Sequence, residues 1–233
     1  MGFYGFNYYS FLFMLPALII SLYAQAKVQS TFQKFSRLSS HGNVTGIEAA
    51  RQVLLRGGVT DVQITTIAGN LTDHFDPTSK VIRLSQNVYG SNSISAVGVA
   101  AHEAGHALQY AEGYVPIKLR GILVPITNLG SRLSMPLILI GLLLPVQYDF
   151  VVYIGIGLYS LMVLFQLVTL PVEFNASARA IRALGESGIL YEEELNGAKK
   201  VLSAAAMTYL AATFTSLLSL LRLLLIAGNR RRN

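Results

Sequence analysis

The sequence contains no cysteine, no tryptophan and only four histidines, and 13% of its residues are charged. Without cysteine there is neither a disulfide framework nor a thiolate metal site, so any metal must be held by His, Asp or Glu. Hydrophobic residues make up 52% of the chain, which is typical of a membrane protein. The net charge of +6 does not indicate nucleic-acid binding, because the basic residues cluster beside apolar runs and are not interleaved with aromatic residues.

Four apolar runs are long enough to cross a hydrocarbon core of about 30 Å as helices. No Lys or Arg precedes Lys27, so the first run is interpreted as a retained helix and not as a cleaved signal peptide. The second run carries Arg132, whose charge is not expected to face lipid, and the spanning helix can be broken near this residue. The predicted parts are a transmembrane helix at 1–26, a catalytic α+β domain at 27–120, a hairpin of two spans at 121–172, a helical segment at 173–200, a fourth span at 201–227 and a basic tail at 228–233.

The polar domain at 27–120 has mixed secondary-structure signals. A capping-box pattern at Thr45 starts a short helix that Gly57 and Gly58 end. In the segments 61–68 and 80–85, β-branched residues alternate with other residues, and a segment rich in turn formers lies between the two. This pattern predicts a β-hairpin or meander. In a strand at the edge of this sheet, the backbone can pair with an extended peptide.

That turn segment also carries Asp73, His74 and Asp76. Residues of these types can complete a metal site, but they more often form turns in which an aspartate side chain bonds the following backbone. Both interpretations stay open from the residues alone.

The string His102-Glu103-Ala104-Gly105-His106 lies in a predicted helix over 94–111. Side chains four residues apart project from one face of a helix, so His102 and His106 can share a metal ion. In this pattern the glutamate takes a proton from a zinc-bound water, which becomes the nucleophile for a peptide carbonyl. The alternative is an ordinary helix that happens to carry these residues. The small apolar residues around them disfavour it, because buried polar groups need partners.

A third ligand is expected downstream of the hairpin, which returns the chain to the side of the membrane where the motif lies. Glu173 is our candidate, and its alternative role is to cap the next helix by charge. Asn175 and Ser177 are candidates to orient a ligand from behind. Candidate donors for the oxyanion of the reaction are His74, Asn175 and Arg179.

Several protease families share the motif but lack other features of this chain. The motif resembles that of membrane-anchored ATP-dependent proteases, but no phosphate-binding G-x-x-x-x-G-K-[ST] loop is present. In metzincins the motif continues with a glycine and a third histidine, and this chain has Gln109 and Glu112 at those positions. Intramembrane site-2-type proteases take an aspartate from a later D-G pair, whereas Asp149 is followed by Phe150.

Over nearly its whole length the chain resembles the YugP-like neutral zinc metallopeptidases of bacterial membranes. The matching features are the N-terminal span, L-T-D-H-F-D-P at 71–77, the H-E-A-G-H helix, the hairpin and P-V-E-F-N-A-S at 171–177. The order of features is also similar to that of HtpX-like and CAAX-prenyl-type membrane peptidases. Those enzymes commonly carry an aspartate where this chain has Ser177.

The resemblance implies that His102, His106 and Glu173 bind one zinc ion and that Glu103 is the general base. It implies a mainly α membrane protein with a small zincin-like α+β domain, and a peptide or membrane-protein substrate at the bilayer. Two alternatives stay open: a peptidase that cleaves within the bilayer with Asp149 as ligand, and a scaffold with a structural zinc.

The distribution of basic residues predicts which side of the membrane carries the site. Thirteen of the eighteen Lys and Arg residues lie in 27–120 and 173–200, which favours a cytoplasmic catalytic side. Four spans would then leave the three arginines of the tail outside, against the same rule. The larger group decides the prediction.

Overall fold

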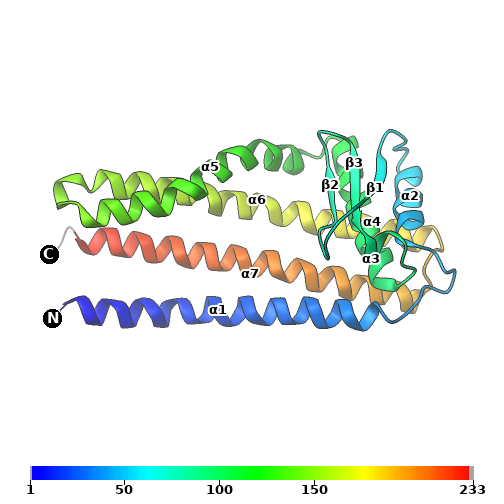
Figure 1. Cartoon of the computed structure of the whole chain (residues 1–233), viewed down its shortest axis with the longest axis horizontal. Helices are drawn as coiled ribbons and strands as arrows, with labels where there is room; N and C mark the ends of the chain where they lie inside the picture. The colour runs from blue at the N-terminus through cyan, green and yellow to red at the C-terminus, as the bar shows by residue number, and fades with distance from the viewer. Residues whose placement is uncertain (1, 231–233) are drawn as a thin grey trace. The chain divides into compact units, whose positions relative to one another are not determined.

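The computed structural model describes residues 2–230, with side chains from residue 12 onward. Residues 231–233 of the predicted basic tail lie outside the described residues. The elements in chain order (Figure 1) are α1 (Gly2–Phe35), α2 (Gly46–Arg56), β1 (Gln63–Ile67), β2 (His74–Asp76), β3 (Val81–Ser85), α3 (Gln86–Tyr89), α4 (Ile94–Ala111), α5 (Val115–Leu143), the 3-10 turn η1 (Val146–Tyr148), α6 (Phe150–Glu186) and α7 (Glu192–Arg230).

Within the described chain, four helical segments are long and apolar enough to cross a membrane. They are 12–35 of α1, α5, the segment 146–186 that contains α6, and α7. The prediction of a mainly α membrane protein with a small α+β part is therefore confirmed.

The long helices continue without a break across the predicted boundaries between apolar spans and polar segments. α1 continues to Phe35, α5 passes Arg132 without a break, and α7 runs from its acidic first turn to Arg230. α6 continues through Pro171 to Glu186, so Glu173 lies inside a helix and does not cap the start of one. A proline can be accommodated in such a helix because neighbouring groups satisfy the carbonyl that loses its partner.

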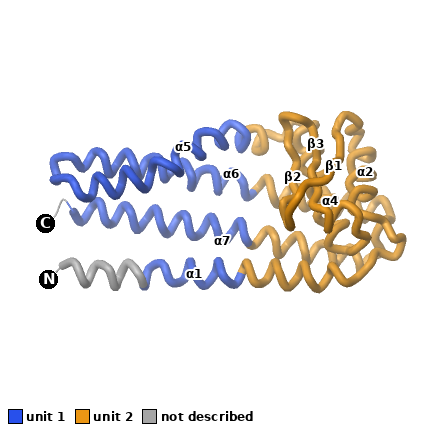
Figure 2. The backbone as a smooth tube through the Cα atoms, viewed as in Figure 1, with its two compact units in different colours: residues 1–23, 119–170, 208–233 blue, residues 24–118, 171–207 orange. Residues whose placement is uncertain are grey.

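The chain divides into two compact units, and all four long helices pass from one unit to the other (Figure 2). Unit 1 comprises residues 1–23, 119–170 and 208–233. In it, α5 packs so closely on α6 that a side chain at Gly141 or Gly155 would collide with the facing helix. At the turn between these helices, the guanidinium of Arg230 lies 3.3 Å from the carboxylate of Asp149.

Unit 2 comprises residues 24–118 and 171–207 and contains the sheet. The strand order is β1-β3-β2, in which β1 pairs parallel to β3 and β2 pairs antiparallel to it. The expected β-hairpin is present, but it is not formed by the segments 61–68 and 80–85, which contain β1 and β3. Part of the turn segment forms β2, which makes the hairpin with β3 and lies at the sheet edge.

α4 lies at the centre of unit 2 and has the predicted bounds. Its start is capped by Ser93, whose side chain accepts a hydrogen bond from the backbone N–H of Ala96. All of its alanines except the terminal Ala111 are buried, and they let α2, the sheet and the unit 2 ends of α6 and α7 pack closely around it. The predicted capping box at Thr45 is also present, with Glu48 accepting from the backbone N–H of Thr45 at 2.8 Å. The segment between the sheet and α4 begins with the short helix α3.

Candidate metal centre

Two histidines of α4 and one glutamate of α6 converge in unit 2. The Nε2 atoms of His102 and His106 lie 3.2 and 3.6 Å from the same oxygen, Oε2 of Glu173. Among the described residues, these three form the group that can hold a metal ion, with one ligand atom from each lying within 4.8 Å of the others. His106 and Glu173 are buried, whereas His102 is partly exposed, so the group is accessible from the His102 side.

The donor set fits a zinc ion. Ligand atoms at about 2.0–2.1 Å in tetrahedral array around zinc lie roughly 3.4 Å from one another, and the two contacts to Glu173 are close to this spacing. Each imidazole also has a polar partner at its other nitrogen. His102 Nδ1 lies 3.1 Å from the Ser177 hydroxyl, and His106 Nδ1 lies 3.0 Å from Oε1 of Gln109. Partners of this kind fix the orientation of metal-binding histidines.

Glu103 lies on α4 directly after His102 and is buried. Burial raises the pKa of its carboxyl group, and the negative charges of Glu173 and Asp73 raise the pKa further, while His102 and a hydrogen bond from the backbone of Phe75 lower it. A carboxyl group whose pKa is raised toward neutrality is better suited to accept and return a proton.

Asn175 and Arg179 lie behind His106. The Asn175 side-chain oxygen accepts from Nε2 of Gln109 at 2.9 Å and from Nε of Arg179 at 2.7 Å. Arg179 also donates to Glu112 at 2.6 Å. Both residues are therefore engaged in a network that supports His106, and their predicted use as oxyanion donors stays a prediction.

Gln109 is the residue of this network that the sequence reasoning missed. It is fully buried, three residues after His106, in a helix whose other residues outside the motif are mostly small or apolar. The sequence does carry a signal for Gln109: it is a polar residue about one helical turn after His106 in apolar surroundings. A buried amide needs hydrogen-bond partners, so such a residue is a candidate partner of the histidine.

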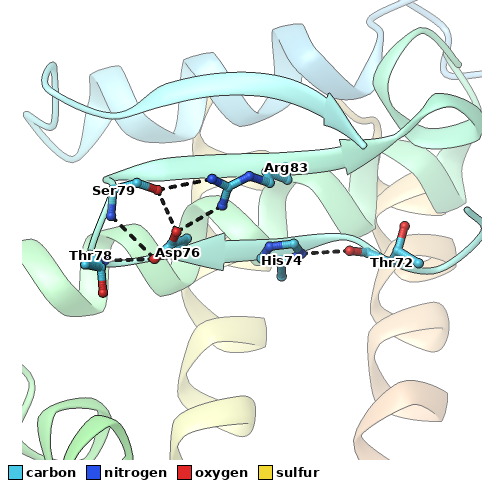
Figure 3. A network of polar contacts seen from close by, with 6 residues as sticks. All are labelled: Thr72, His74, Asp76, Thr78, Ser79 and Arg83. Carbon is cyan, nitrogen blue, oxygen red and sulfur yellow. Dashed lines mark hydrogen bonds and ion pairs between the residues drawn. The ribbon is translucent and has the colours of Figure 1, made fainter. Parts of the chain in front are cut away.

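The acidic turn segment has its own contacts (Figure 3). Asp76 accepts from the backbone N–H of Thr78, from Ser79 and from Arg83, and these hydrogen bonds hold the pKa of Asp76 well below its usual range. His74 Nδ1 bonds the carbonyl of Thr72 at 2.8 Å. The group of described residues that can hold a metal does not include either residue, and Asp76 has the predicted turn geometry.

Asp73 and Asp149 are likewise engaged elsewhere. Asp73 accepts from the backbone N–H of Ser85 at 2.7 Å, which ties the start of β2 to the end of β3. Asp149 belongs to unit 1, where it is paired with Arg230, and it is not in the metal-holding group found among the described residues.

Comparison with known proteins adds a family and a relative. A family model described as "Putative neutral zinc metallopeptidase" matches residues 10–228. The chain is 46% identical to "Putative membrane protease YugP" of Bacillus subtilis (strain 168) over 222 residues, which is 95% of this chain and 98% of that protein. No solved structure matches the chain significantly. Because the match covers nearly the whole chain, the protein belongs to the family described as "Putative neutral zinc metallopeptidase".

Proposed function

We propose that this protein is a zinc-dependent endopeptidase of the cell membrane with its active site at the cytoplasmic face. The convergence of His102, His106 and Glu173 beside a buried Glu103 is the observation that carries the proposal. Family membership supports the same chemistry.

One zinc ion would be held by the two histidines and Glu173. Structural zinc sites are almost always closed by four protein ligands, whereas catalytic sites use three and leave a position open. The three-residue group therefore favours a catalytic site over a scaffold with a structural zinc.

Each residue around the site would have its own role in peptide hydrolysis. A bound zinc ion supplies Lewis acidity, which acidifies a water molecule and polarises the scissile carbonyl. Glu103 accepts a proton from the attacking water as the water oxygen bonds to the carbonyl carbon. Glu103 then passes that proton to the peptide nitrogen as the C–N bond breaks, which yields a carboxylic acid and an amine; the acid then ionises by giving its proton to the amine. Ser177 holds His102 by its Nδ1 atom throughout.

The substrate would bind as an extended strand along β2. β2 is an edge strand of the sheet, it contacts α4, and the backbone of its residue Phe75 lies close enough to Glu103 to lower the pKa of that carboxyl group. A peptide that pairs with this edge would therefore pass beside the general base, with backbone hydrogen bonds that do not depend on its side chains.

The cytoplasmic location rests on charge. Unit 2 carries most of the Lys and Arg residues of the chain, which are retained on the cytoplasmic side of bacterial membranes. Unit 2 also carries the metal-holding group, so both would lie on the same side.

Metal analysis of purified variants tests the proposal. Wild type is expected to contain one zinc per chain, Glu173→Gln to lose it, and Asp149→Asn to retain it. The reverse pattern, with zinc lost from Asp149→Asn and kept by Glu173→Gln, would overturn the ligand assignment and favour cleavage within the bilayer.

A further inference from the structure

Both ends of the buried amide of Gln109 make hydrogen bonds. Its Oε1 atom contacts His106 Nδ1 at 3.0 Å, and its Nε2 atom donates to the backbone carbonyl of Val172 at 2.8 Å and to the side-chain oxygen of Asn175 at 2.9 Å. The side chain thus joins a histidine of α4 to the part of α6 that carries Glu173.

The direction of these bonds follows from the chemistry of the partners. A backbone carbonyl only accepts, so the NH₂ end of Gln109 must face Val172. At the far end of the network, the guanidinium of Arg179 only donates, so Asn175 must present its oxygen to both Arg179 and Gln109. Oε1 of Gln109 therefore faces His106, and the only group that can bond it there is an Nδ1–H.

We infer that Gln109 is a positioning residue that fixes the proton of His106 on Nδ1 and leaves the lone pair of Nε2 for the metal. This inference rests on the proposed zinc function. In a metal site the hydrogen bond at one ring nitrogen sets the protonation of the other. Because Val172 precedes Glu173 in the chain, the same amide also ties the third ligand to the histidine helix.

Ser177 provides the internal comparison. Its hydroxyl lies 3.1 Å from His102 Nδ1, but a hydroxyl can either donate or accept and so does not impose a direction. Gln109 imposes one on His106. The two histidines can therefore be perturbed separately, each through its own partner.

The experiment combines zinc affinity with nuclear magnetic resonance of the zinc-loaded, full-length protein. Labelling with ¹⁵N-histidine gives four imidazoles in all, because the chain has four histidines. Gln109→Met keeps the length of the side chain and removes its hydrogen bonds. Gln52→Met makes the same change at an exposed position of α2 and is the matched control. Gln109→Asn is a second variant, whose amide is one methylene too short to reach all three partners.

The expected result is a selective loss. Both Gln109 variants should bind zinc about 10–100-fold more weakly, which is the usual effect of removing such a partner. In the zinc-loaded state, the Nδ1–H signal of His106 should lose its protection from solvent exchange while that of His102 is unchanged. Ser177→Ala should affect His102 alone, and Gln52→Met should match wild type.

A purely structural tie predicts something different. It predicts a lower unfolding temperature with the zinc dissociation constant and the His106 signal both unchanged, and that result overturns the inference while the proposed function stands. If wild type binds no zinc, or if Glu173→Gln binds zinc as tightly as wild type, the proposed function fails and the inference fails with it.

Discussion

Gly105 lies directly against the backbone of Ala176, so closely that a Cβ atom at Gly105 would come within 2.6 Å of the Ala176 carbonyl oxygen. Gly105 is the residue between Glu103 and His106 that has no side chain, and Ala176 lies three residues after Glu173. The close approach of the two backbones is what lets a glutamate on α6 reach the histidines on α4.

Gly105→Ala should therefore push α4 and α6 apart. Adding a methyl group where no space exists costs about 1–3 kcal/mol of unfolding free energy. We expect zinc affinity to fall as well, by about tenfold or more, because the support of Glu173 is displaced. Thermal unfolding and zinc competition titration measure both effects. Gly157→Ala on α6 is the control, since its methyl group would enter open space, and an equal loss in both variants would contradict the explanation.

Glu103→Gln should separate metal binding from turnover. Glutamine has nearly the same shape as glutamate but cannot accept the proton of the attacking water, so peptidase activity should fall by about 10²–10⁴-fold. The zinc content should remain one per chain, because Glu103 is not in the metal-holding group. Hydrolysis of a quenched fluorescent peptide and metal analysis of the same sample test the prediction. Wild-type activity in Glu103→Gln would remove it from the mechanism.

The absence of cysteine allows a direct test of membrane orientation. Single cysteines placed at Leu55 in α2 and at Val146 in η1 would both be exposed. If α5 crosses the membrane and unit 2 is cytoplasmic, a membrane-impermeant maleimide should label Val146→Cys on intact cells and Leu55→Cys only after permeabilisation. Labelling of Leu55→Cys on intact cells would contradict the cytoplasmic site.

Acid should weaken the β2–β3 hairpin through Asp76. Hydrogen bonds to its carboxylate lower the pKa of Asp76 below the ordinary value of 3.8, so the carboxylate stabilises the fold fully at pH values well above 3.8. That contribution is lost as the pH falls through the lowered pKa. The stability advantage of wild type over Asp76→Asn should therefore shrink on acidification. Unfolding of zinc-free protein over a range of pH measures it, and an advantage that grew as the pH fell would contradict it.

The sequence was most informative where one residue pattern determines one structure. The bounds of α4, the capping box at Thr45 and the four apolar runs are local signals, set by periodicity, capping chemistry and length. Glu173 was also chosen from the sequence as the residue to join His102 and His106, because the hairpin returns the chain to their side, and the three residues do lie together.

Features that depend on contacts between distant segments could not be predicted. Nothing local shows that 63–67 pairs parallel to 81–85, since the three-residue strand that takes the hairpin position has no alternating pattern of useful length. The hydrogen bonds of Gln109 depend on which carbonyl of α6 faces it. Glu173 was expected at the start of the helical segment 173–200, because the apolar run ends at Val172, whereas α6 continues through this point to Glu186.

The unbroken α6 gathers several parts of the site on one stretch of helix within unit 2. Val172, Glu173, Asn175 and Ser177 follow one another in this stretch, so the third ligand and the partners of Gln109 and His102 keep a fixed spacing. Under the proposed function, a distortion of the helix at this stretch would disturb the metal ligand and the support of both histidines together.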